Sequence, residues 1–88
     1  MPRIVRCGLI QVHCEWSPEK YSLAQIKQKM VAKHEKLIAS AAKKKVQILG
    51  LQELFYGPYF CAEQQTRWYE LTEPVPGGPT IGRMQSLA

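Results

Sequence analysis

The stretch VQILGLQELFYGPYF, residues 46–60, decides the fold. A mostly apolar run, residues 46–51, ends abruptly at the polar pair Gln52-Glu53, and an aromatic loop broken by Gly57 and Pro58 follows. The apolar run predicts a buried strand of a sheet that is covered on both faces. In open α/β sheets ligands bind where strands end, so Glu53 is a candidate catalytic carboxylate.

A second strand and a long helix precede this strand. Residues 4–12, IVRCGLIQV, are rich in β-branched side chains and predict a strand. Apolar side chains then recur at every third or fourth position over residues 23–41, which predicts an amphipathic helix that ends near Lys44. Ser22 and Gln25 have the spacing of a capping box at its start. The order strand, helix, strand predicts a βαβ unit with parallel strands.

The remaining sequence is rich in loops. It favours a short turn of helix at residues 62–69, a turn at residues 74–78, and a new helix with Pro79 at its first position. Two strands cannot make a buried parallel sheet, and one helix cannot cover both of its faces. We therefore expect the 88 residues to be the opening segment of a larger α/β protein. The alternative is a small domain that another chain completes.

Composition argues against several classes of protein. No apolar run approaches the roughly 20 residues of a membrane helix, and the N-terminus lacks the pattern of a signal peptide. We therefore expect a cytoplasmic protein that binds no membrane. The three cysteines include no CxxC pair, which favours reduced thiols. Neither a metal-ligand spacing nor a glycine-rich phosphate loop occurs, so no metal or cofactor is expected.

The net charge of +5 is local, because residues 22–45 hold seven lysines and one glutamate. We interpret them as the solvated face of the helix. A basic helix that binds nucleic acid is the weaker alternative, because no base-stacking aromatic residues lie among the lysines.

The chain resembles the N-terminal part of the nitrilase superfamily of carbon–nitrogen hydrolases. The matching segments are IVRCGLIQV, LIASAAKKKVQIL, GLQELFYGPYF and EPVPGGPT. LQELFYGPYF followed by WYELTEPV is most similar to the β-ureidopropionase and N-carbamoylputrescine amidase group. The resemblance implies a four-layer α-β-β-α sandwich and a homo-oligomer. Residues 1–88 would form the N-terminal βαβ portion of a single hydrolase domain, incomplete in this chain.

The resemblance also implies a catalytic set of glutamate, lysine and cysteine. Glu53 falls on the position of the general base, which takes the proton of the cysteine thiol. The family's lysine and cysteine lie further downstream than this chain reaches, so the isolated chain is expected to be inactive. The implied substrate is a small amide or ureido compound, most of all an N-carbamoyl amide. A non-catalytic fragment or paralogue that associates with a complete subunit remains an alternative.

The aromatic loop has two interpretations. Phe55, Tyr56, Tyr59 and Phe60 either line a substrate pocket beside Glu53 or anchor the core or an oligomer interface. Trp68 and Tyr69 are interpreted as structural residues.

No cysteine matches the family's nucleophile motif. Cys7 is expected to be a small core residue, Cys14 faces away from its neighbour His13 on an extended segment, and Cys61 is the least unsuitable reactive thiol. Within the segment HEKL, we interpret His34 as a packed side chain and Lys36 as a solvated one.

Overall fold

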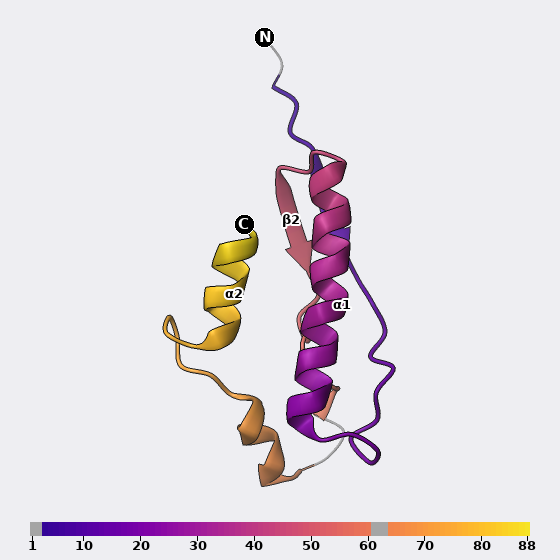
Figure 1. Ribbon diagram of the computed structural model, residues 1–88, viewed down its shortest axis with the longest axis vertical. Coiled ribbons are helices and arrows are strands. Elements are labelled where there is room, and N and C mark those ends of the chain that lie inside the picture. The colour runs from indigo at the N-terminus through magenta and orange to yellow at the C-terminus, as the bar shows by residue number, and fades with distance from the viewer. Residues whose placement is uncertain (1–2, 61–63) are drawn as a thin grey trace.

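A two-stranded parallel sheet and one long helix form the centre of the structure, a computed structural model that describes residues 3–60 and 64–88. Cys7 pairs with Ile48 and Ile10 with Leu51. Figure 1 shows the helix α1 running in front of β1 and beside β2. The predicted βαβ unit with parallel strands is therefore confirmed. The elements, in order, are β1 (Cys7–Ile10), α1 (Leu23–Lys43), β2 (Ile48–Leu51), the 3₁₀ helix η2 (Thr66–Leu71) and α2 (Pro79–Leu87).

Both strands are shorter than the sequence predicted. At each end of the pair, a glutamine side chain takes the place of a backbone carbonyl as the acceptor of a hydrogen bond from the segment that flanks β1. The backbone N–H of Arg6 donates to Gln47 Oε1 at 3.0 Å, just before β1. The N–H of Val12 donates to Gln52 Oε1 at 2.6 Å, just after β1. The backbone donors that flank the strand are thus satisfied without further strand pairing.

One face of the sheet is exposed. Leu9 is 90% exposed and Ile48 61% exposed, and Cys7 lies on the same face by register. The sequence predicts a sheet covered on both faces, but within residues 3–60 and 64–88 no element covers this face. The prediction that Cys7 is a core residue is wrong: the alternation of β1 turns its side chain to the open face, whereas Gly8 and Ile10 are half-buried.

Local sequence signals set both ends of α1. Ser22 and Gln25 form the predicted capping box, each bonding to the backbone of the other. At the other end Lys44 is the C-cap, as expected, and Lys45 takes a left-handed φ of 60°. The N–H groups of Lys45 and Val46 donate back to carbonyls of the last turn, which is a Schellman motif with lysine where glycine is usual.

The core lies along one stripe of α1. Leu23, Ile26 and Met30 are buried there, and Leu71 of η2 completes the cluster. His34 continues the stripe with 0% exposure, so the prediction of a packed histidine is confirmed, and Lys36 is exposed as expected. The core is small for the chain. The radius of gyration is 15.0 Å, against about 12 Å for a compact domain of this length.

The turn before α2 is built around Glu73. Pro79 occupies the first position of α2, as predicted, but the N-cap residue Gly78 has no side chain to cap the helix. The carboxylate of Glu73 takes that role by accepting the N–H of Thr80 at 2.7 Å and also its hydroxyl. The predicted helical turn at residues 62–69 is found as η2 from Thr66 to Leu71, and residues 62 and 63 lie outside the described residues.

A side chain at Gly78 should destabilise the fold, because neighbouring atoms of Pro74 and Glu73 occupy the space that its Cβ would need. A Cβ there would lie 2.7 Å from the carbonyl oxygen of Pro74 and 2.8 Å from Glu73 Oε1, the atom that caps α2. We expect Gly78→Ala to lower the free energy of unfolding by about 1–3 kcal/mol, as for other overpacked sites. Its matched control is Gly77→Ala, because a Cβ on Gly77 meets nothing within 4 Å. Urea unfolding of both variants checks this, and equal midpoints would contradict it.

Candidate active site

Glu53 lies two residues beyond the end of β2, at the start of the aromatic loop. It is exposed and forms part of the wall of a cavity of about 650 Å³. The strand delivers this carboxylate to the end of the sheet where ligands bind in α/β proteins.

The walls of the cavity are mainly aromatic and come from two segments. The loop after β2 supplies one wall, and the 3₁₀ helix η2 supplies the other. Such a lining suits a small organic substrate, with a few polar groups fixing its orientation. The main wall residues are Phe55, Tyr56, Phe60, Trp68, Tyr69 and Leu71.

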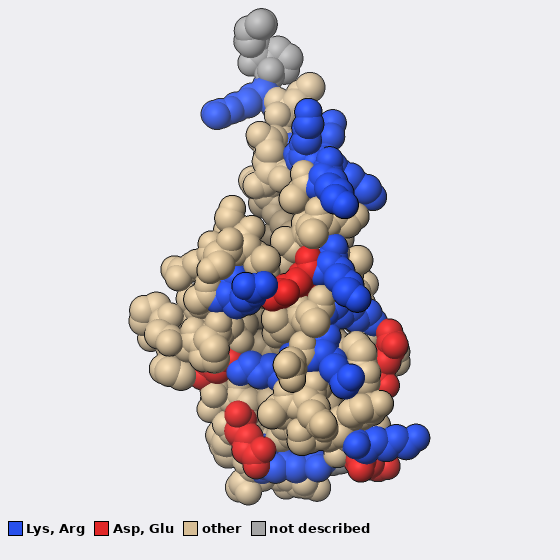
Figure 2. All heavy atoms as spheres, in the orientation of Figure 1, with Lys and Arg blue, Asp and Glu red and all other residues tan. Residues whose placement is uncertain are grey.

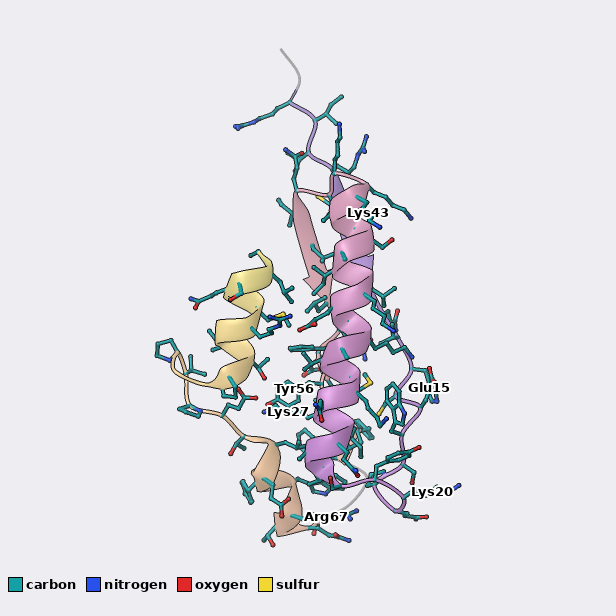
Figure 3. The ribbon with its side chains drawn as sticks, in the orientation of Figure 1. Glu15, Lys20, Lys27, Lys43, Tyr56 and Arg67 are labelled. Atoms are coloured by element: carbon teal, nitrogen blue, oxygen red, sulfur yellow. The ribbon has the colours of Figure 1, made fainter. Side chains whose placement is uncertain are left out.

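Tyr56 joins the two walls to α1. Its hydroxyl donates to the carbonyl of Leu71 at 2.6 Å, and the ammonium of Lys27 lies 4.7 Å from its ring centroid. Figure 3 shows the side chains of Lys27 and Tyr56 meeting beside α1. On the core side, Phe55 meets both Tyr56 and the buried His34 edge to face. Contacts with the helix therefore hold the aromatic loop beside Glu53.

The carboxylate of Glu73, in the segment between η2 and α2, links the two helices α1 and α2. Glu73 forms an ion pair with Lys27 and caps α2 through Thr80, and its side chain is only 11% exposed. Burial raises its pKa, but hydrogen bonds from Lys27 and Thr80 outweigh burial and hold the pKa below its ordinary value of 4.5. A carboxylate whose pKa is lower in the folded than in the unfolded state stabilises the fold at any pH above the unfolded-state pKa. This stabilisation is lost as the pH falls through the folded-state pKa. The link is thus complete at neutral pH and weakens in acid.

The structure separates the loop residues that the sequence grouped together. Phe55 and Phe60 line the cavity with Glu53, whereas Tyr59 is 69% exposed and borders a shallower recess of about 440 Å³. Cys14 borders the same recess. Cys61 lies outside the described residues.

The 3₁₀ helix η2 forms part of the site although no local sequence motif indicates it. Trp68 packs against the core, which fits the structural role that the sequence predicts for it, but Trp68 and Tyr69 also line the cavity. The contact of Tyr56 with Leu71, 15 residues away, brings η2 to the loop. The one sequence feature that could have indicated this second wall is the concentration of aromatic residues in positions 55–69.

The described lining of the cavity carries one carboxylate, that of Glu53. Apart from Glu53, its described lining has amide and hydroxyl groups, such as those of Gln64 and Thr72, but neither lysine nor cysteine. The site as described can accept a proton at one carboxylate and hold an organic substrate. It supplies neither a thiol nucleophile nor a cation for an oxyanion.

The described surface also carries a basic patch. Lysines and arginines gather at the end of the molecule where α1 ends, with no carboxylate among them in the view of Figure 2. Over residues 3–60 and 64–88, no helix is long and apolar enough to cross a membrane. The same residues include no cluster of His, Cys, Asp or Glu suited to a metal ion.

Comparison with known proteins decides the family. The sequence profile of the family "Carbon-nitrogen hydrolase" matches residues 8–88, which include β2, Glu53 and the cavity walls. The chain belongs to the carbon–nitrogen hydrolases. This confirms the resemblance to the nitrilase superfamily. No solved structure matches the chain.

Several curated carbon–nitrogen hydrolases are similar to the chain. N-carbamoylputrescine amidase of Solanum lycopersicum is 47% identical over 58 residues, which are 66% of this chain and 19% of that protein. The enzyme of the same name from Oryza sativa subsp. japonica is 38% identical over 69 residues, 78% of this chain and 23% of that protein. The chain thus matches about a fifth of the length of these relatives.

Proposed function

We propose that this chain supplies the general base of a hydrolase that cleaves N-carbamoyl amides, and that Glu53 is that base. The observation that carries the proposal is the position of Glu53, just beyond a parallel strand and in the wall of an aromatic cavity. Membership of the carbon–nitrogen hydrolases supports the reaction class. The names of the similar plant enzymes support the substrate class.

In the proposed mechanism Glu53 accepts the thiol proton of a cysteine supplied from outside the described residues. The thiolate attacks the ureido carbon, and a lysine stabilises the oxyanion of the tetrahedral intermediate. The bond from this carbon to its NH2 group then breaks, and the departing ammonia takes the proton held by Glu53. Water hydrolyses the resulting thioester to the free thiol and a carbamate, which decomposes to the amine and carbon dioxide. The overall reaction converts one N-carbamoyl amine and one water into an amine, ammonia and carbon dioxide. Phe55, Tyr56 and Phe60 would contact the substrate, since they line the cavity with Glu53.

The chain would form the N-terminal part of a single hydrolase domain with a four-layer α-β-β-α sandwich. The exposed sheet face supports this arrangement, because Leu9 and Ile48 are apolar and remain in contact with solvent. A second sheet packed on that face would bury both side chains, as in other two-sheet folds.

Ammonia release tests the proposed function. The protein from the natural reading frame should convert an N-carbamoyl amine into ammonia and amine in equal amounts, and should leave a peptide bond intact. The 88-residue chain should release none, because its described cavity offers neither lysine nor cysteine. Failure of the natural protein to hydrolyse any N-carbamoyl amine would contradict the proposal.

A non-catalytic chain that associates with a complete subunit is the second candidate. The incomplete catalytic set and the exposed apolar sheet face favour it. In the same assay this candidate predicts no ammonia from the natural protein alone, and altered release when it is mixed with a complete hydrolase subunit.

A further inference from the structure

Gln52, the residue before Glu53, makes a contact at each end of its carboxamide. Its Oε1 accepts the backbone N–H of Val12 at 2.6 Å, and its Nε2 donates to the backbone carbonyl of Leu54 at 3.2 Å. The first bond fastens the end of β2 to the segment after β1. The second closes a small ring of atoms around the backbone of Glu53.

We infer that Gln52 is a positioning residue for the general base Glu53, an inference that rests on the proposed function. The residues on both sides of Glu53 are held through one side chain, so the turn that aims its carboxylate is tied to the sheet. A general base must lie within hydrogen-bond reach of the proton it takes. A misplacement of about 1 Å can lower a rate by about 10²-fold, so such a tie matters for turnover.

The two contacts require a carboxamide of this length. Val12 offers a donor and Leu54 an acceptor, so the side chain between them must accept at one end and donate at the other. Glutamate could accept from Val12 but would set a carboxylate oxygen against the Leu54 carbonyl. Leucine could make neither bond.

The chain contains a matched comparison at the other end of the same strands. Gln47 Oε1 accepts the backbone N–H of Arg6 at 3.0 Å, before β1 and β2 begin. Gln47 and Gln52 thus extend the same sheet by the same type of bond, one at each end. Only Gln52 lies beside Glu53. A purely structural role would make the two glutamines equivalent, whereas a positioning role would not.

The test compares Gln52→Leu, Gln52→Glu and Gln47→Leu by amide exchange in this chain and by kinetics in the natural full-length protein. Gln52→Leu should raise the exchange rate of the Val12 amide by roughly tenfold, the effect of one lost hydrogen bond. It should lower kcat by about 10- to 100-fold with KM changed by less than about threefold.

The other two variants serve different purposes: Gln47→Leu is the control at the far end of the sheet, and Gln52→Glu separates the bond to Val12 from the bond to Leu54. Gln47→Leu should raise the exchange of the Arg6 amide to a similar extent and leave kcat within about twofold, because the site is untouched. Gln52→Glu keeps the acceptor for Val12, so the Val12 amide should stay protected while kcat falls. If Gln52→Leu does not fold, the kcat of Gln52→Glu still tests the inference.

Two outcomes would overturn the inference. One is an equal loss of kcat in Gln47→Leu and Gln52→Leu. The other is an unchanged kcat in both Gln52 variants while Glu53→Gln is inactive, which leaves the proposed function standing. An active Glu53→Gln variant would instead contradict the proposed function and the inference with it.

Discussion

Replacing Glu53 by glutamine in the natural full-length protein should lower kcat for an N-carbamoyl amine by roughly 10³- to 10⁴-fold. Glutamine keeps the size and polarity of the side chain but cannot accept the proton that activates a thiol. The aromatic walls that would bind the substrate are unchanged, so KM should stay within about threefold. Because Glu53 is exposed, the thermal unfolding midpoint should be unaffected.

Glu70→Gln is the matched control for this variant. Glu70 is also an exposed glutamate near the cavity, in η2, but it does not line the cavity. Steady-state kinetics should give a kcat within about twofold of the unmodified protein, as expected for a residue outside the site. If Glu53→Gln and Glu70→Gln had the same kcat, Glu53 would not be the base.

The sequence predicted the parts of the fold that depend on neighbouring residues. The capping box at Ser22, the helix along residues 23–43 and the start of α2 at Pro79 all follow from local bonding rules, and all are confirmed. The parallel pairing of β1 and β2 follows from their order around the helix.

Features that depend on distant contacts were not predictable in this way. The strands end early because Gln47 and Gln52 bond across the sheet to residues about 40 positions away. The exposure of Cys7 depends on which face of β1 the helix covers, and alternation alone does not specify that choice.

The candidate site also combines a part that local sequence indicates with a part that depends on distant contacts. Glu53 and the aromatic loop are continuous in sequence with β2, so strand position was enough to make Glu53 a candidate, and the family resemblance supplied its expected role. The second wall, at Trp68 and Tyr69, reaches the site only through tertiary contacts such as that between Tyr56 and Leu71.

The largest effect on stability should come from Ile26→Ala, at the centre of the core. Ile26 has 0% exposure and lies in the cluster with Leu23, Met30 and Leu71. Truncating a buried isoleucine to alanine lowers the free energy of unfolding by about 2–5 kcal/mol, through lost burial and the cavity left behind. A typical domain is stable by only about 5–15 kcal/mol, so much of the chain's stability would be lost.

Leu37→Ala on the same helix separates core packing from helix propensity. Leu37 has a side chain of equal size but is 37% exposed, so its truncation should cost clearly less than that of Ile26. Urea unfolding followed by tryptophan fluorescence can measure both, because Trp16 and Trp68 pack against this core. Tyr56 and Trp68 also line the cavity, so loss of the core should disturb the site as well. Equal losses in the two variants would contradict the prediction, because burial of Ile26 would then add nothing to stability beyond helix propensity.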